Sequence, residues 1–261
     1  MKKLIGFAVL ALIVTSCTWR KFENQDDLRN NYVGESAFTE MTNMTDQAID
    51  GSLVFYKGKQ NCATITVDTT SNPKVIVIDF GPTNCQCDDG KTRRGAIITT
   101  FTGPYGQAGT VITHTPQDYY VNDYKVEGTK IVTNNGNNGN GDPYFTVDID
   151  GTITTPDGEV FTYVSDRIRT WEVGHDTPLN VYDDEYSITG TASGTNQNGG
   201  SYTIATGTPV YYTLACRRPV SGTLTINLSS LNDDILVDYG DGTCGYSFTA
   251  MYRGKTYTIF Y

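Results

Sequence analysis

Two carboxylates, two residues apart, are the side chains of this chain best spaced for chemistry. The stretch FTVDIDGTIT, residues Phe145–Thr154, carries Asp148 and Asp150 just before a glycine. Carboxylate oxygens are ligands that Ca²⁺ prefers. If Asp148 is position 1 of a twelve-residue calcium loop, Asp150 falls at position 3 and Glu159 at position 12. The spacing therefore makes Asp148, Asp150 and Glu159 a candidate metal site, with calcium as the candidate cofactor.

A hairpin turn explains the same stretch more simply. A calcium loop of this type requires glycine at position 6, whereas Gly151 falls at position 4, and no helix is expected on either side. Asp157 and Gly158 lie between two β-branched and aromatic runs, GTITT and EVFTYV. Asp-Gly between such runs is typical of a tight β-hairpin. We expect a strand that ends near this turn.

The same motif resembles the nucleophile motif of haloacid-dehalogenase-type phosphatases. That resemblance implies that Asp148 attacks phosphorus and that Asp150 handles the proton of the leaving group. The chemistry needs a nucleophile at the end of a parallel strand in an α/β sheet, with later cations and further carboxylates for magnesium. Here no helix is expected after the motif, and Lys255 is the only lysine that follows it. We do not expect phosphoryl transfer.

No other set of residues identifies a catalytic centre, so the sequence predicts no catalytic residue. Cys85 and Cys87 precede two aspartates, but zinc needs four ligands and the chain has 2 histidines, His114 and His175. A Ser-His or Cys-His hydrolase has little support, and the carboxylates are too numerous to single out a glycosidase pair. A second acidic cluster has the same two interpretations as the first, a cation site or turns: Asp233, Asp234, Asp238 and Asp241.

Composition describes the elements that must carry these residues. The formal net charge is −10 and no basic stripe is present, so nucleic acid is not an expected partner. Charged residues make up 18% of the chain, whereas glycine (27) and tyrosine (18) are abundant. This composition is typical of strands and tight turns. The tyrosines allow a sugar-stacking platform, but cross-strand packing is the commoner role.

The N-terminal residues resemble a bacterial lipoprotein signal. Lys2 and Lys3 precede an apolar run, Leu4 to Val14, that is too short to span a membrane. Val14-Thr15-Ser16-Cys17 then resembles a lipobox, which implies a signal peptide over residues 1–16 and acylation of Cys17, palmitate included. An ordinary secretory signal or a short membrane anchor are the alternatives. The expected partner is thus a membrane, and the expected location the cell envelope, at the outer membrane, facing either the periplasm or the outside.

One short helix and many strands are expected after the anchor. Residues 17–35 are polar and predict a lipidated tether. Over residues 36–50, apolar side chains at helical spacing predict a helix capped by Ser36: Phe38, Met41, Met44, Ala48 and Ile49. Residues 51–261 predict an all-β fold, an antiparallel meander, sandwich or barrel. The low-complexity stretch 134–143 is either a seam between two halves or a long hairpin loop.

An internal repeat predicts the disulfides. VIVIDFGPTNC (75–85) and ILVDYGDGTC (235–244) both join an aliphatic strand to Asp-[Phe/Tyr]-Gly and a cysteine, with another cysteine and a strand upstream. The repeat pairs Cys62 with Cys85 and Cys216 with Cys244, leaving Cys87 over; the competing pair is Cys62 with Cys87.

The chain as a whole resembles the uncharacterised β-rich lipoproteins of Bacteroidota-type bacteria, through the lipobox, the acidic tether and the strand-turn pattern. This resemblance implies no activity. We expect a lipid-anchored cell-envelope protein of non-enzymatic binding or structural type, whose partner is glycan, lipid or an envelope protein. The alternative is a hydrolase of envelope or extracellular polymers whose carboxylates the sequence does not locate.

Overall fold

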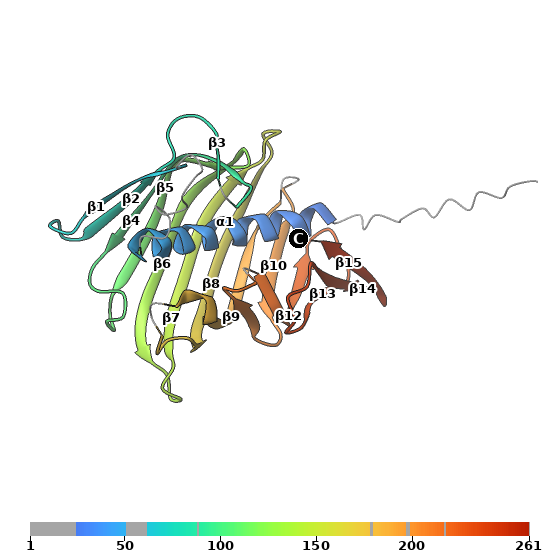
Figure 1. The fold of residues 1–261 in the computed structure, drawn as a ribbon. Helices are drawn as coiled ribbons and strands as arrows, with labels where there is room; N and C mark the ends of the chain where they lie inside the picture. The colour runs from blue at the N-terminus through green and yellow to red at the C-terminus, as the bar shows by residue number, and fades with distance from the viewer. Residues whose placement is uncertain are drawn as a thin grey trace, which may run out of the picture.

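The computed structural model describes residues 25–50, 62–87, 89–177, 180–196, 199–216 and 218–260. Strands make up most of the described chain and α1 is its one α-helix, so the predicted all-β class is confirmed. One twisted antiparallel sheet contains all of its strands, and one long helix, α1, crosses a face of that sheet (Figure 1). No described helix combines the length and the apolar character that crossing a bilayer requires.

The strands follow one another as a meander. Their order across the sheet is β1-β2-β4-β5-β6-β7-β8-β9-β10-β12-β13-β14-β15, with β3 paired to β4 and β11 paired to β9 and β12. Consecutive strands joined by short turns pair antiparallel without crossover connections. Their bounds are β1 Thr64–Asp68, β2 Lys74–Asp79, β3 Cys85–Gln86, β4 Thr92–Phe101, β5 Val111–Val121, β6 Tyr124–Asn137, β7 Pro143–Thr154, β8 Val160–Val173, β9 Glu185–Thr195, β10 Ser201–Thr206, β11 Val210–Thr213, β12 Arg218–Leu228, β13 Ile235–Asp241, β14 Ser247–Tyr252 and β15 Lys255–Phe260. A short 3-10 helix, η2, spans Val181–Asp183.

Helix α1, Gln25–Asp50, is longer than the sequence predicted. Its first residues were expected to belong to the tether, and Ser36 was expected to cap it; Ser36 lies within the helix instead. Contacts with β8, a strand distant in the sequence, hold this first part of the helix. Gly34 packs on the ring of Tyr163 in β8, and the Tyr163 hydroxyl donates a hydrogen bond to Glu35. Contacts between residues so far apart leave no local pattern in the sequence, which is why the boundary was missed.

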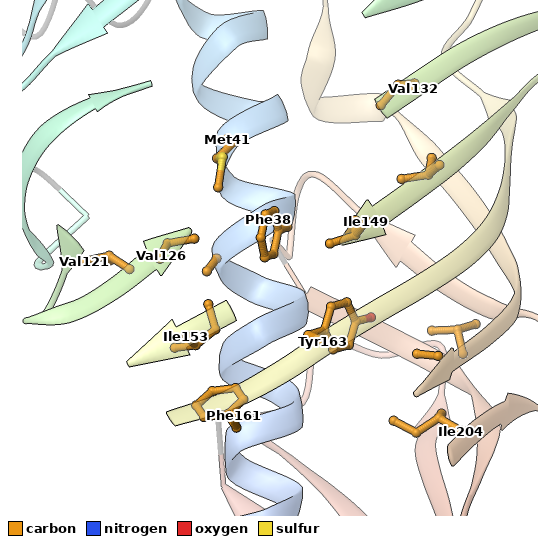
Figure 2. Packing of buried hydrophobic residues seen from close by; sticks show 14 of the residues in the cluster. Phe38, Met41, Val121, Val126, Val132, Ile149, Ile153, Phe161, Tyr163 and Ile204 are labelled. Carbon is orange, nitrogen blue, oxygen red and sulfur yellow. The ribbon is translucent and has the colours of Figure 1, made fainter. Parts of the chain in front are cut away.

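The apolar stripe of α1 forms the centre of the core. Phe38, Met41, Met44 and Ala48 are buried, as their spacing predicted, while the side chain of Ile49 lies outside the described part. Figure 2 shows Phe38 and Met41 among side chains from the strands below the helix. We call the sheet face that α1 covers the inner face and the opposite one the outer face.

Strand β7 shows how the sequence separates the two faces. Val147, Ile149 and Ile153 are buried against the helix, whereas Asp148 and Asp150 alternate with them and are exposed. Side chains along a strand point to opposite faces in turn, so this alternation fixes the register. Gly151 also faces inward, where a Cβ would overlap the Phe38 ring. The glycine of the Asp-x-Asp-Gly motif therefore makes room for the helix.

Ion pairs around a buried arginine hold the second half of the helix on the sheet. Arg93 of β4 is 1% exposed, and its guanidinium contacts Glu40 of α1 at 2.9 Å and Asp89 at 2.5 Å. Lys91 pairs with the same glutamate. Glu40 and Asp89 compensate the buried charge of Arg93. Removal of one partner of a buried ion pair leaves an uncompensated charge, which is strongly destabilising.

Residues 134–143 form a hairpin connection, not a seam. Strand β6 ends at Asn137 and β7 begins at Pro143, and the two strands pair along their whole length in one continuous sheet. Asn134 is buried and its side-chain amide donates to the Tyr105 carbonyl at 2.9 Å. The hairpin alternative is therefore the one observed.

The two repeat units lie toward opposite ends of the sheet and have the same local structure. Disulfides join Cys62 to Cys85 and Cys216 to Cys244, the predicted pairs, and each encloses a hairpin, β1-β2 or β12-β13. In both units the aspartate of the Asp-[Phe/Tyr]-Gly turn accepts a hydrogen bond from the glycine N–H, at 2.8 Å and 2.9 Å. Cys87 belongs to neither disulfide.

Candidate ligand-binding groove on the outer face

A groove of about 890 Å³ lies on the outer face and crosses six neighbouring strands, β6 to β10 and β12. Two cross-strand rows of side chains form its floor, and we call this surface the outer groove. The first row is Ile131, Asp148, Asp166, Thr191, Ala205 and Thr225, and the second is Thr129, Asp150, Val164, Ser193, Thr203 and Asn227. Asp234 also lines it.

Small side chains, and two glycines at which neighbouring strands approach closely, accompany the hollow. Six of the twelve row residues are threonine, serine or alanine, whose short side chains rise little above the backbone. Gly128 in β6 and Gly190 in β9 adopt positive φ values of 115° and 127°, and a Cβ on either would overlap a neighbouring strand's carbonyl oxygen. Only glycine tolerates both the positive φ and this close approach of a neighbouring backbone. With strands about 4.8 Å apart, the groove is about 24 Å long.

The charged residues that line the groove are all acidic. Asp148, Asp150, Asp166 and Asp234 line it, and none of the described lining residues is a lysine or an arginine. Asp148 and Asp166 are direct cross-strand partners. Burial, and then the charge of Asp166, raises the pKa of Asp148 above its ordinary value. Like charges directly opposite each other destabilise a sheet, so this pair is not explained by folding.

The predicted calcium ligands are only partly brought together. Asp148 and Asp150 both face the groove, but Glu159 lies beyond the end of β7 in the turn before β8. Glu159 pairs with Thr155, five residues beyond Asp150, so an extended strand places it about 17 Å farther along the sheet than Asp150. The stretch from Asp148 is a strand and not a ligand loop, and the described chain contains no group of three or more histidine, cysteine or acidic residues arranged to hold a metal ion.

The Asp157–Gly158 turn is present as predicted. The Gly158 N–H donates to the Thr155 carbonyl at 2.9 Å, and Thr155 pairs with Glu159 across the hairpin. Because this tight turn joins β7 to β8, it sets the register that places Asp148 opposite Asp166.

The second acidic cluster is divided among separate partners. Asp233 pairs with Arg253, and Asp234 accepts a hydrogen bond from Asn227 in the groove. Asp238 and Asp241 accept hydrogen bonds from nearby backbone N–H groups, as expected for turn residues.

None of the described histidine, cysteine and tyrosine residues lines the groove. His114 is buried beside Thr42, Thr45 and Thr99 on the inner face, and His175 is exposed in a loop. Several tyrosines pack inward, which supports the packing interpretation for them: Tyr119, Tyr163, Tyr186 and Tyr202. No aromatic residue is among the described residues that line the groove.

The principal groove residue that the sequence analysis did not single out is Asp166. Asp166 could have been found from the alternation in VFTYVSDRIR and the Asp-Gly turn, because together they place Asp166 opposite Asp148. Lys2, Cys17 and the rest of residues 1–24 lie outside the described part of the chain, so the predicted anchor stays a prediction. Comparison of the chain with family models, with curated proteins and with solved structures finds no match.

Proposed function

We propose that the protein is a lipid-anchored cell-envelope protein of non-enzymatic, binding type. Its outer groove would receive an extended, positively charged segment of an envelope partner. The observation that carries this proposal is the groove itself, a hollow across six strands that four carboxylates line and that no described cation neutralises. Charge complementarity of this kind chooses partners and speeds their encounter.

The dimensions favour an extended chain as the occupant. A peptide in extended conformation covers about 3.4 Å per residue, so about seven residues match the length of the groove. The two rows lie about 7 Å apart, which is the spacing of alternate side chains on a strand. Glycan is the less favoured ligand because the described lining residues offer no aromatic ring for stacking on a sugar.

The proposed anchor keeps the groove close to a membrane. Only residues 18–24 separate Cys17 from the start of α1. Eight residue steps span at most about 29 Å, so an acylated Cys17 holds the sheet within one domain diameter of the bilayer. Two or three acyl chains give stable anchoring, at about 0.8 kcal/mol for each buried methylene.

A peptide-binding measurement tests the proposed groove. The probe is a fluorescent heptapeptide of alternating lysine and threonine, titrated with the purified protein and followed by anisotropy. Asp148→Asn with Asp166→Asn should weaken binding about 2–30-fold, since each exposed ion pair contributes about 0.2–1 kcal/mol. Binding should also weaken as salt is raised.

Glu172→Gln is the matched control, because Glu172 is exposed on the same strand as Asp166 but lies outside the groove. Equal losses in the control and the double variant would contradict the proposal. Salt-independent binding of a neutral polysaccharide in place of the peptide would contradict it as well, and would favour glycan.

A second candidate function, hydrolysis of an envelope or extracellular polymer, is favoured by one observation. Asp148 and Asp166 face each other across two strands, and the pKa of Asp148 is raised. Cβ atoms of such partners lie about 4.5–5.5 Å apart, and the two carboxyl groups of retaining glycosidases are about 5–5.5 Å apart. Turnover of a polysaccharide that Asp148→Asn and Asp166→Asn each abolish, and that Glu172→Gln preserves, would establish this function.

A further inference from the structure

The first cross-strand row of the outer groove continues beyond the groove. Thr225 of β12 pairs with Leu236 of β13, and Leu236 pairs with Met251 of β14. Direct partners on neighbouring strands point to the same face of a sheet, so both side chains lie on the outer face. We call Leu236 and Met251 the apolar pair.

Both members of the apolar pair are large and exposed. Leu236 is 37% exposed and Met251 is 42% exposed, whereas their chain neighbours Ile235, Val237 and Ala250 are buried on the inner face. The outer-face positions around the pair are polar: Asp238, Thr249, Thr256 and Thr258. Single exposed apolar residues are common, but two cross-strand partners form a contiguous apolar surface. Core packing does not account for this surface, because the buried residues of these strands lie on the other face.

The apolar residues at the acidic end of the row have different neighbours. Ile131 pairs with Asp148 in the first row, and Val164 pairs with Asp150 in the second. A lysine side chain packs its stem on apolar groups while its ammonium reaches a carboxylate. This end of the row therefore suits lysine side chains, and the far end suits an apolar side chain.

The order of the strands sets the distance between the two ends. Asp148 and Asp166 lie on β7 and β8, and the apolar pair lies on β13 and β14, five strand spacings away. Five spacings are about 24 Å, which about seven residues of an extended peptide cover. Side chains that point to the same side of such a peptide are an even number of residues apart, so a separation of about six to eight residues fits.

We propose that the occupant of the outer groove carries a large apolar side chain about six to eight residues from its basic side chains, and that the apolar pair receives it. This inference rests on the proposed binding function and supplies its specificity. Long-range charge attracts any basic segment to an acidic surface, so charge alone discriminates little among such segments. Contact with the apolar pair adds a short-range requirement that only segments with the apolar residue at the right distance meet.

Two fluorescent nonapeptides of identical composition test the distance. Both have lysine at the first and third positions and threonine elsewhere, except for one leucine, at the ninth position in one peptide and at the fifth in the other. With the lysines at Asp148 and Asp166, the ninth position lies over the apolar pair and the fifth over Thr191 and Ala205. By anisotropy, the peptide with the ninth-position leucine should bind about 3–10-fold more tightly, since half-burial of a leucine side chain gives a gain of this size.

Substitution of the apolar pair tests the place. Leu236→Thr with Met251→Thr should remove the difference between the two peptides without weakening the peptide whose leucine is at the fifth position. Phe260→Thr is the matched control, because Phe260 is also exposed on the outer face but lies on β15 about 14 Å along the strand from Thr256, the partner of Met251. A difference that persists in the double variant, or that Phe260→Thr also abolishes, would overturn the inference.

The side-chain methyl group of Met251 gives a second readout that needs no variant. In NMR spectra of protein labelled at methionine methyl groups, this resonance should shift with the ninth-position peptide and stay in place with the fifth-position one; an unmoved resonance refutes the site. Equal binding of both peptides would overturn the role of the apolar pair and leave the proposed groove intact. Absence of binding by both peptides would contradict the groove itself, and this inference with it.

Discussion

Close packing of the Phe38 ring on Gly151 allows a quantitative test of how α1 is held on the sheet. Phe38 is completely buried, and its ring lies directly over Gly151 of β7. Truncation of a buried phenylalanine to alanine costs about 3–5 kcal/mol in free energy of unfolding. For a domain of this size that is a fall in Tm of about 6–20 °C. Phe38→Ala alone should therefore be strongly destabilising.

Gly151→Ala should also destabilise, but for the opposite reason. Its Cβ would lie well inside the separation of about 3.5–4.0 Å that two carbon atoms need, so the ring or the strand must move. Overpacking of this kind costs about 1–3 kcal/mol. In the Phe38→Ala background the ring is absent, the cost disappears, and alanine even gains up to about 1 kcal/mol over glycine within a strand. The coupling between the two substitutions should be about 1–3 kcal/mol.

The assay is equilibrium urea unfolding of the four proteins of this cycle, followed by intrinsic fluorescence. Gly158→Ala, at a positive-φ turn where a Cβ meets no neighbour, is a control that should not couple to Phe38→Ala. Additive effects of Gly151→Ala and Phe38→Ala, within about 0.5 kcal/mol, would refute the packing of the helix on β7.

Three further predictions concern pH, the disulfides and the anchor. The pKa of His114 is lowered in the folded state, so the unfolded state binds its proton first as the pH falls. The free energy of unfolding should therefore keep its full value above about pH 6.5 and fall toward pH 5.5, by at most about 1.4 kcal/mol per pH unit. In urea unfolding, His114→Gln should flatten this slope, and the exposed His175→Gln should not. Replacing Cys216 and Cys244 by serine should lower the free energy of unfolding by about 3–4 kcal/mol, because the bridge closes a sequence separation of 28 residues; a change below about 1 kcal/mol would contradict its structural role. Cys17→Ala should move the protein from the membrane to the soluble fraction on cell fractionation, and an unchanged distribution would overturn the anchor.

Local patterns were enough to predict the strands, the apolar stripe of α1 and the disulfides. Alternation along β7 and the Asp-Gly turn after it are properties of adjacent residues, and so is the Asp-[Phe/Tyr]-Gly unit that carries each cysteine pair. The face of the helix followed from its period of 3.6 residues. In each of these features, residues that are close in the sequence are also close in space.

The features that sequence reasoning missed depend on contacts between distant residues. Helix α1 extends to Gln25 although its early residues are polar, because Gly34 and Glu35 meet Tyr163 on β8. The ion pair between Glu40 and Arg93 likewise joins the helix to β4. Neither partner in these pairs has a local pattern that indicates the other.

The outer groove could be predicted from the sequence only in part. The pairing of Asp148 with Asp166 follows from the hairpin turn and was within reach of the sequence. The continuation of both rows to β12 was not, because it requires the order of strands beyond β8 and the close strand approaches at Gly128 and Gly190. Of the three candidate calcium ligands, Asp148 and Asp150 share this surface, and Glu159 does not.

The outer groove is the surface on which we propose that this protein binds its partner. NMR mapping of isotope-labelled protein with the lysine–threonine heptapeptide is the decisive experiment. We expect amide shifts to concentrate on outer-face positions of β6 to β10 and β12, around Asp148 and Asp166, and to vanish in the double asparagine variant. Shifts confined to another surface, or shifts that persist unchanged in that variant, would contradict it.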